Sequence, residues 1–494
     1  METTRKSGLL FHPSSLPGKF GIGTLGKEAY KFVDFLIESG QKLWQILPLG
    51  PTGFGDSPYQ CFSAYAGNPL LIDFEVLYQE GWLTQKDLLL KTTFDDSSVD
   101  YGKIFTFKYP LLKKAFVNFR KNTGIDKTKF TIFCRKNIHW LDDYSLFMAL
   151  KEHFKNEPWT NWENKIKMRH DDTVNYYIEH LSEEIEFQKF IQYIFFKQWT
   201  ELKSYANRNY IQIIGDVPIY ISLDSADAWI NSDIFLFDEH CNPIEVAGVP
   251  PDYFSETGQL WGNPIFNWDR LKETGFEWWL NRIKANLILY DIVRIDHFRG
   301  FEAYWSVNYG ETTAVNGQWK LAPGKELFET IREKLGEIPI IAEDLGIITE
   351  KVEELRDNFQ LPGMKVLQFA FDRDPKNDYL PHNYPKNCIV YTGTHDNDTI
   401  KSWYEQSDKI DKDFINNYLN FDERNISWSL IRLAWASTAD IAITPLQDIL
   451  NLGGESRMNT PGEAVGNWTW RLKKDQLTTE IAHNLKAMTE IYGR

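Results

Sequence analysis

Short runs of apolar residues recur along the chain, and each ends in polar residues or in glycine and proline. Segments with apolar residues at helical spacing separate most of these runs, for example residues 26–40 and 324–336. The second segment begins after Pro323 and stops at Gly336, as helices commonly do. The strand-like runs are eight in number, at residues 7–13, 42–51, 211–220, 291–298, 338–346, 363–371, 387–396 and 439–448. Near-continuous apolar strands that alternate with helices predict an α/β protein with a closed parallel (β/α)₈ barrel, the TIM-barrel architecture.

The spacing of the runs is uneven, which predicts insertions in the barrel. About 160 residues separate the second run from the third, too many for a single crossover. We expect residues 1–70 to form the first part of the barrel, 71–190 a mainly helical inserted subdomain, and 191–494 the remainder of the barrel. A second insertion, residues 241–270, is rich in proline, glycine and aromatic residues and is expected to be a loop. No separate C-terminal β-sandwich domain is expected.

The run "DIVRIDHFRG" at 291–300 carries charges inside a buried strand. Because side chains alternate across a strand, Ile292, Arg294 and Asp296 share one face. A buried charge is costly unless it is paired. Two interpretations stay open at this point. The pair is a salt bridge at a strand end, or Asp296 is a catalytic carboxylate that Arg294 holds ionised.

Acidic residues also gather at the ends of other runs. Active sites of parallel barrels lie at the C-terminal ends of the strands. Alternation places Glu343 on the face of Ile341, and Asp396 on the face of Thr392, so both acids should point into the barrel mouth. One acidic strand end is more often structural than catalytic, but several that converge favour catalysis. The polar residues at these ends are Asp216, Arg294, Asp296, Glu343, Asp344, His395, Asp396 and Asp398.

Converging carboxylates either bind a metal together with histidines or perform acid–base and nucleophilic chemistry. A metal-dependent barrel hydrolase would carry a His-x-His pair on its first strand, where this chain offers only His12, so no metal is expected. Glycoside chemistry needs one protonated acid and one ionised carboxylate. Arg294 beside Asp296 favours the ionised form of that acid. Glu343 follows an apolar run without a nearby cation, so burial is expected to raise its pKa.

Composition and net charge narrow the classes of molecule that the protein could bind. The chain has 494 residues and a net charge of −15, which argues against nucleic acid and anionic membranes. Its four cysteines form no C-x-x-C pair, its N-terminus lacks a signal peptide, and no apolar stretch is long enough to span a membrane. We therefore expect a cytoplasmic protein. Aromatic residues make up 15% of the chain, which raises the prospect of sugar binding because sugar rings stack on aromatic faces.

Specific motifs carry a resemblance to a known family. The ends "RIDHFRG", "IIAEDLG" and "TGTHDNDT" resemble the catalytic strand ends of the α-amylase clan. Longer segments resemble the amylomaltase, or disproportionating enzyme, family of 4-α-glucanotransferases, from near Gly8 to Arg471. These are "GPTGFGDSPYQCFSAYAGNP", "GDVPIYISLDSADAW", "PPDYFSETGQLWGNPIFNW", "LPGMKVLQFAF" and "MNTPGEAVGNWTWR".

The resemblance implies a retaining double displacement. The enzyme would move α-1,4-glucan segments from a donor maltooligosaccharide to the 4-hydroxyl of glucose or another glucan. It would do so without a metal or organic cofactor. No nucleic acid, membrane or obligate protein partner is implied.

Residue roles follow from the same resemblance. Asp296 would be the nucleophile, Glu343 the acid/base, and Asp396 the group that holds the sugar's secondary hydroxyls in the transition state. Tyr59 would be an aromatic platform beneath the sugar, and Asp216 either part of the pocket or a buried hydrogen-bonding brace. The positions implied to bind substrate are Asp56, Ser57, Tyr59, Asp216, Gln259, Trp261, Asn263, Arg294, His395 and Asn459.

Residues 241–270 are the expected active-site loop. A covalent glycosyl-enzyme can be attacked by water, present at about 55 M, or by a sugar hydroxyl, so transfer needs a bound acceptor and limited water access. Pro250, Tyr253, Phe254 and Trp261 would make the loop stiff and apolar enough to cover the cleft. The alternative is a loop packed on the rim without touching substrate. A mainly hydrolytic α-glucanase and an inactive carbohydrate-binding protein are the rival functions.

Overall fold

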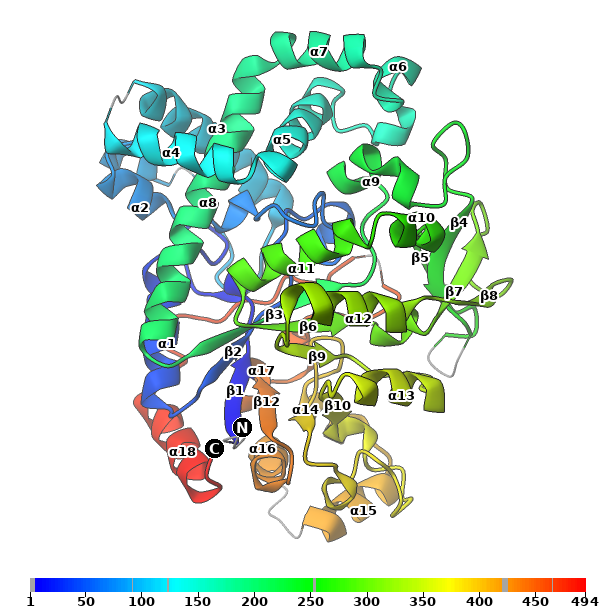
Figure 1. The fold of residues 1–494 in the computed structure, drawn as a ribbon. Coiled ribbons are helices and arrows are strands. Elements are labelled where there is room, and N and C mark those ends of the chain that lie inside the picture. The colour runs from blue at the N-terminus through cyan, green and yellow to red at the C-terminus, as the bar shows by residue number, and fades with distance from the viewer. Residues whose placement is uncertain (1–4, 91, 122–123, 252–254, 420–424, 464) are drawn as a thin grey trace.

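The computed structural model describes residues 5–90, 92–121, 124–251, 255–419, 425–463 and 465–494. Its centre is a parallel sheet of eight strands in the order β10-β11-β12-β1-β2-β3-β6-β9 (Figure 1). Between the two end strands, the Ala342 N–H donates to the Pro362 carbonyl at 3.0 Å, so the sheet is nearly closed into a barrel. Each strand overlaps one of the eight apolar runs, and the predicted barrel is confirmed. The strands are β1 (Lys6–Leu10), β2 (Leu43–Gln45), β3 (Gln212–Pro218), β6 (Ile292–Asp296), β9 (Ile340–Ala342), β10 (Gly363–Val366), β11 (Cys388–Tyr391) and β12 (Ile441–Pro445).

These strands are apolar on both faces because one face packs inside the barrel and the other against helices. All four residues of β11 are buried. Gly8 permits close packing of β1 on β2, since a Cβ there would lie 2.3 Å from the Leu43 carbonyl oxygen. The helices that surround the sheet are α1 (Lys27–Glu38), α11 (Glu277–Leu289), α12 (Gly324–Leu335), α13 (Glu350–Asn358), α14 (Ile400–Gln406), α16 (Ile426–Ala436) and α18 (Thr479–Ile491) (Figure 1).

A group of helices lies between β2 and β3, on one side of the barrel (Figure 1). The last of them, α8 (Ser182–Arg208), runs from this group down to the barrel wall, where the Trp199 indole donates to the Leu289 carbonyl at 3.0 Å. The expected domain boundary at residue 190 falls within α8, and the division into domains stays a prediction. The other helices are α2 (Phe74–Gln79), α3 (Tyr101–Arg120), α4 (Ile125–Lys136), α5 (Ile138–His153), α6 (Asn164–Lys167) and α7 (Asp171–His180).

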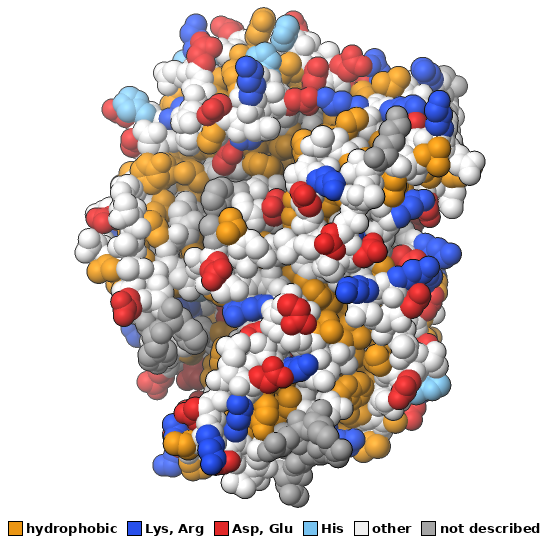
Figure 2. All heavy atoms as spheres, turned by 180° about the vertical axis from the view of Figure 1, so that it is seen from behind, with side chains coloured by type: hydrophobic (Ala, Val, Ile, Leu, Met, Phe, Trp, Pro, Cys, Tyr) orange, Lys and Arg blue, Asp and Glu red, His pale blue; other side chains and the backbone are white. Residues whose placement is uncertain are grey.

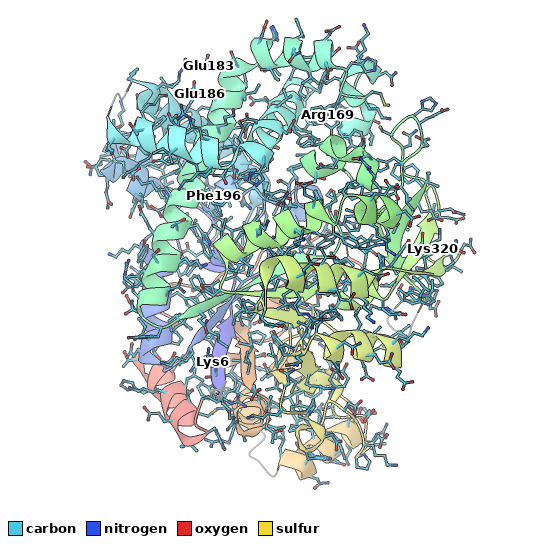
Figure 3. The ribbon with its side chains drawn as sticks, viewed as in Figure 1. Lys6, Arg169, Glu183, Glu186, Phe196 and Lys320 are labelled. Atoms are coloured by element: carbon cyan, nitrogen blue, oxygen red, sulfur yellow. The ribbon has the colours of Figure 1, made fainter. Side chains whose placement is uncertain are left out.

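A second sheet replaces the loop that we expected at residues 241–270. Its four antiparallel strands have the order β5-β4-β7-β8, with bounds Gln259–Pro264, Glu245–Val249, Ala303–Asn308 and Gln318–Leu321. Val246, Val307 and Ala314 form a small buried cluster on this sheet. Lys320 of β8 pairs with Glu245 of β4 at 2.6 Å (Figure 3). The loop prediction was wrong for these strands because proline and glycine obscured the alternation. Tyr253 and Phe254 lie outside the described residues.

Helices and loops complete the described chain. After β12 the described residues form α17 (Leu446–Ile449), a short 3₁₀ turn and α18. Within the described ranges, no helix has the length and apolarity needed to cross a membrane. Figure 2 shows acidic and basic side chains interspersed over the face opposite to that of Figure 1. The remaining helices are α9 (Ala226–Ile230), α10 (Trp268–Glu273) and α15 (Lys409–Leu419).

Candidate active site

Strand register brings two acidic strand ends together. In the β6–β9 pair, Ile295 lies opposite Ala342, so Asp296 and Glu343 are the next residues on neighbouring strands. The Glu343 N–H donates to the Ile295 carbonyl at 3.0 Å and extends this pairing beyond β9. Asp296 ends β6, whereas Glu343 follows β9 by one residue. The sheet itself therefore places these two residues side by side.

The Arg294 guanidinium forms ion pairs with both Asp216 and Asp296. Its Nη1 lies 2.5 Å from Asp216 Oδ2 and 3.1 Å from Asp296 Oδ1. The Tyr59 hydroxyl donates to the same Asp216 oxygen at 2.7 Å. The Arg294 and Asp216 side chains are 4% and 0% exposed, whereas that of Asp296 is 28% exposed. The buried salt bridge is present, and the same guanidinium contacts Asp296, as the catalytic interpretation of this run requires.

Glu343 is buried between two backbone donors. The His297 N–H donates to its Oε2 at 2.6 Å, and the Leu345 N–H to its Oε1 at 3.0 Å. Burial raises the pKa of Glu343 to about 7, while the charge of Arg294 and the two N–H groups oppose the rise. The sequence predicted that burial raises the pKa of Glu343. It gave no sign that Arg294 and the two backbone N–H groups oppose the rise. A carboxyl with a pKa near neutrality can both donate and accept a proton at physiological pH.

Two opposing influences act on the pKa of Asp296, namely burial and a nearby cation. Burial raises the pKa of its carboxyl well above the ordinary value, and the nearby acids Asp216, Glu343 and Asp396 add to the rise. Arg294 opposes them. The sequence predicted both the arginine and the convergence of acids, but not that burial outweighs the arginine and raises the pKa of Asp296. Within the Asp296–Glu343 pair, the guanidinium contact favours the negative charge on Asp296.

Asp396 lies on a loop after β11 rather than on the strand. The strand ends at Tyr391, so the alternation that we extended to Asp396 does not apply. The Asn459 amide donates to Asp396 Oδ1 at 2.6 Å, and Arg457 donates to the Asp396 carbonyl at 2.6 Å. These two side chains fix a carboxyl that is 43% exposed toward solvent. Asp396 is thus held at a defined position with its side chain open to solvent.

Aromatic rings stack beside this carboxyl. Tyr59 and His395 are nearly parallel, with ring centroids 5.2 Å apart and an angle of 14°. Trp468 packs against both, at 5.7 Å from Tyr59 and 5.8 Å from His395. Burial lowers the pKa of His395, so its imidazole is neutral at pH 7. Trp468 was not among the residues predicted to form the site, although it lies in the motif that contains Asn459, because a single tryptophan resembles any core residue.

A cleft of about 300 Å³ connects these groups. Asp296 and Asp396 open into it, whereas Asp216, Arg294 and Glu343 lie beneath its surface. Most of the residues implied to bind substrate are therefore brought together. The lining residues used below are Ser57, Tyr59, Gln259, Trp261, Asn263, Asp296, His297, His395, Asp396, Asn459 and Trp468.

The β5 strand forms one wall of the cleft. The Trp261 indole stands edge-on to His297, with centroids 4.8 Å apart, and donates to Gln259 Oε1 at 3.2 Å. Asn263 is 5% exposed, and its amide donates to the Ile221 carbonyl at 2.6 Å. Gln259 and Trp261 are thus presented by a strand, and Asn263 is engaged mainly with protein.

Two residues that the resemblance implies in substrate binding, Asp56 and Ser57, precede Tyr59 in the chain. Ser57 lines the cleft, but Asp56 is not among the described residues that line it. Asp56 ends a 3₁₀ helix (Phe54–Asp56) with a φ of 57°, and burial raises the pKa of its carboxyl. Among the described residues, no three His, Cys, Asp or Glu side chains are grouped as metal ligands.

Fold and site together define a barrel enzyme of carbohydrate chemistry. The family model described as 4-α-glucanotransferase matches residues 11–478, and the chain belongs to this family. A 4-α-glucanotransferase of Clostridium butyricum is 52% identical over 487 residues, covering 98% of this chain and 99% of that protein. One of Thermus thermophilus is 48% identical over 503 residues, with both chains fully covered. An amylomaltase from Streptococcus agalactiae, solved in complex with acarbose, has a TM-score of 0.97 at 46% identity, with 99% of each chain covered.

Proposed function

We propose that this 4-α-glucanotransferase works by double displacement with Asp296 as nucleophile and Glu343 as acid/base. Glu343 gives its proton to the glycosidic oxygen as the bond from that oxygen to the anomeric carbon breaks. An Asp296 oxygen bonds to the same carbon and inverts it. In the second step an acceptor 4-hydroxyl attacks that carbon, Glu343 takes the hydroxyl proton, and the bond to Asp296 breaks. Two inversions give retention.

The observation that carries this proposal is the hydrogen bond from the His297 N–H to Glu343 Oε2 at 2.6 Å. His297 follows Asp296 directly, so the bond ties the acid/base to the chain position next to the nucleophile. The pKa of Glu343, about 7, suits a group that alternates between acid and base. The Arg294 contact with Asp296 supports the role of an ionised nucleophile.

Asp396 and the rings beside it support the proposed sugar-binding role. One oxygen of Asp396 is held by Asn459, and the side chain is exposed to the cleft. Such a carboxylate can accept two neighbouring sugar hydroxyls as positive charge develops on the anomeric carbon. Tyr59 and His395 provide a flat surface and a neutral donor beside it.

Asp216 acts as a brace in this proposal. It is fully buried and accepts from both Tyr59 and Arg294 on the same oxygen. Its charge keeps the guanidinium in place, and the guanidinium keeps Asp296 in place. This geometry favours the brace over direct sugar contact.

Transfer rather than hydrolysis depends on the β5 wall. Gln259 and Trp261 stand on a hydrogen-bonded strand, so they can hold an acceptor at a fixed distance from the glycosyl-enzyme. We propose that a bound sugar at this wall excludes water from the anomeric carbon. A packed rim without substrate contact is less consistent with Trp261, which lines the cleft.

The proposed donors are α-1,4-glucans and maltooligosaccharides, with glucose or a glucan as acceptor. The acarbose in the S. agalactiae structure supports a saccharide ligand for a protein of this shape. Cytoplasmic location is supported by four cysteines that are all free thiols. No protein partner is required by the proposed chemistry.

Incubation with maltotriose tests the function. Transfer predicts glucose together with a ladder of longer oligosaccharides. Glucose and maltose without longer products would indicate a hydrolytic α-glucanase. Binding of maltotriose without turnover would indicate a carbohydrate-binding protein.

A further inference from the structure

Asp344 is a buried acid beside Glu343 that the proposed mechanism does not use. It follows Glu343 directly in the chain, two residues after the end of β9. The carboxyl of Glu343 contacts backbone N–H groups of His297 and Leu345, whereas that of Asp344 contacts β10 and α13. Asp344 is not among the described residues that line the cleft. Its role is therefore to be sought in its effect on Glu343 rather than in contact with the sugar.

Two elements hold the carboxyl of Asp344. The Met364 N–H on β10 donates to Oδ1 at 2.7 Å, and the Arg356 guanidinium on α13 donates to Oδ2 at 2.6 Å. The side chains of Asp344 and Arg356 are 4% and 15% exposed, so the solvent screens this ion pair only weakly. The pair fixes the segment that carries Glu343 against the next strand of the barrel and the helix before it.

The chain leaves a fitted space for this carboxyl. Gly363 is the first residue of β10, and a Cβ there would lie 2.3 Å from Asp344 Oδ2. Any side chain at this position would displace the carboxylate from Arg356. The absence of a Cβ at Gly363 thus allows β10 to approach the acid closely enough for the hydrogen bond from Met364.

The charge of Asp344 also acts on the acid/base. Burial raises the pKa of Glu343, and the negative charge of Asp344 adds to the rise. Arg294 and the N–H groups of His297 and Leu345 oppose it. Charges interact more strongly in a buried site than in water, so the neighbouring carboxylate counts for more here than it would at the surface. Asp344 therefore offsets part of the effect of the Arg294 guanidinium.

The other groups that face the two carboxyls keep one charge state near neutral pH. Burial raises the pKa of Asp344, while the Met364 N–H, Arg356 and Lys365 oppose the rise. Asp296, which is paired with Arg294, faces Glu343 from β6. Burial raises the pKa of the nearby tyrosine and cysteine groups, which are therefore neutral at pH 7. These groups are Tyr379, Cys388 and Tyr391.

We propose that Asp344 is a positioning residue for the acid/base, which together with Arg356 sets the place of Glu343 and the pH at which it loses its proton. This inference rests on the proposed role of Glu343. The hydrogen bonds of Asp344 hold the segment after β9, and its negative charge keeps the proton on Glu343 up to a higher pH. The Arg356 cation balances part of that charge and so limits the effect.

Asp344→Asn tests the inference because it removes the charge and keeps an oxygen that can accept from the Met364 N–H. Glu343 should then lose its proton at a lower pH. The alkaline limb of kcat/KM for maltotriose should move down by roughly one pH unit. A limb that stays at the parental pH, even with a lower rate at every pH, would mean a purely structural role and would overturn the inference.

The double variant Asp344→Asn/Arg356→Gln removes both charges of the pair. The limb should still move to lower pH, but by less than in the single variant, because the cation is gone as well. This variant leaves neither member of the pair charged without the other, so it keeps the test open if the single variant does not fold. An unchanged limb in the double variant would also count against the inference.

Two controls separate this inference from the proposed function. Asp357→Asn removes the other carboxylate that pairs with Arg356, on a side chain that is 65% exposed, and should leave the limb within about 0.2 pH unit of the parent. A glucosyl fluoride needs no proton donor in its first step and should show no alkaline limb in any of these proteins. The same limb with both donors in the unmodified enzyme would contradict the proposed role of Glu343 itself.

Discussion

Glu343 accepts a hydrogen bond of 2.6 Å from the backbone N–H of His297. Because His297 follows Asp296, the geometry of the nucleophile and that of the acid/base are not independent. Any shift at the end of β6 therefore moves both the nucleophile Asp296 and the acid/base Glu343. The short β6–β9 pairing therefore sets the distance across which a glycosidic bond is cleaved.

Replacement of Glu343 by Gln removes the proton donor but keeps the size and one of the two backbone hydrogen bonds, because an amide nitrogen cannot accept the second. Turnover of maltotriose should fall by about 10²–10⁴-fold, the usual contribution of general acid catalysis. The first step with a glucosyl fluoride should change far less, because fluoride leaves without protonation. Rates of fluoride and glucose release measure the two effects. Equal losses with both donors would reject the acid role.

The pH profile follows from the same carboxyl. Since burial raises the pKa of Glu343 to about 7, its acid form is present below that pH and is lost as the pH rises through it. The kcat/KM for maltotriose should therefore decline above pH 7. The fluoride donor serves as control, since its first step should show no such decline. A flat profile for maltotriose between pH 6 and pH 9 would contradict this assignment.

Two changes at Tyr59 separate its ring from its hydroxyl. Tyr59→Phe loses the hydrogen bond to Asp216 and keeps the stack on His395, so kcat/KM should fall by roughly fivefold, about 1 kcal/mol. Tyr59→Ala also removes the ring and should cost roughly a hundredfold. Initial rates with maltotriose give both values. Similar losses in the two variants would deny the platform role.

Stability depends on the Arg294–Asp216 pair. Arg294→Leu leaves the fully buried Asp216 without its cation and should lower the free energy of unfolding by about 3–5 kcal/mol. Adding Asp216→Asn removes the unpaired charge and should restore part of the loss. Urea unfolding measures the free energy of unfolding of the single and the double variant. No recovery in the double variant would mean that lost packing, rather than the buried charge, causes the effect.

The apolar runs predicted the eight barrel strands because burial on both faces leaves a strong local signal. The β4 and β5 strands escaped prediction, since β4 pairs with β7, whose residues lie about 60 positions further along the chain. Local sequence also gave Arg294 beside Asp296, which lie on one strand face. It could not give the partner Asp216, which register supplies from β3.

In the candidate site, too, some residues could be predicted from local sequence and others only from the folded structure. The strand-end acids were found because polar residues after apolar runs stand out. Trp468 was not found, since it looks like a core aromatic until the fold sets its neighbours. The pKa of Glu343 depends on Arg294 and on burial, and both are properties of the folded chain.

The covalent intermediate offers the most direct test of the central claim that Asp296 is the nucleophile. In the Glu343→Gln variant, a maltosyl fluoride should form the glycosyl-enzyme quickly, and the intermediate should persist because the base for the second step is gone. Mass spectrometry of the digested protein should find the added sugar on the peptide that contains Asp296. Sugar attached to a different residue, or none attached during fluoride release, would contradict the account.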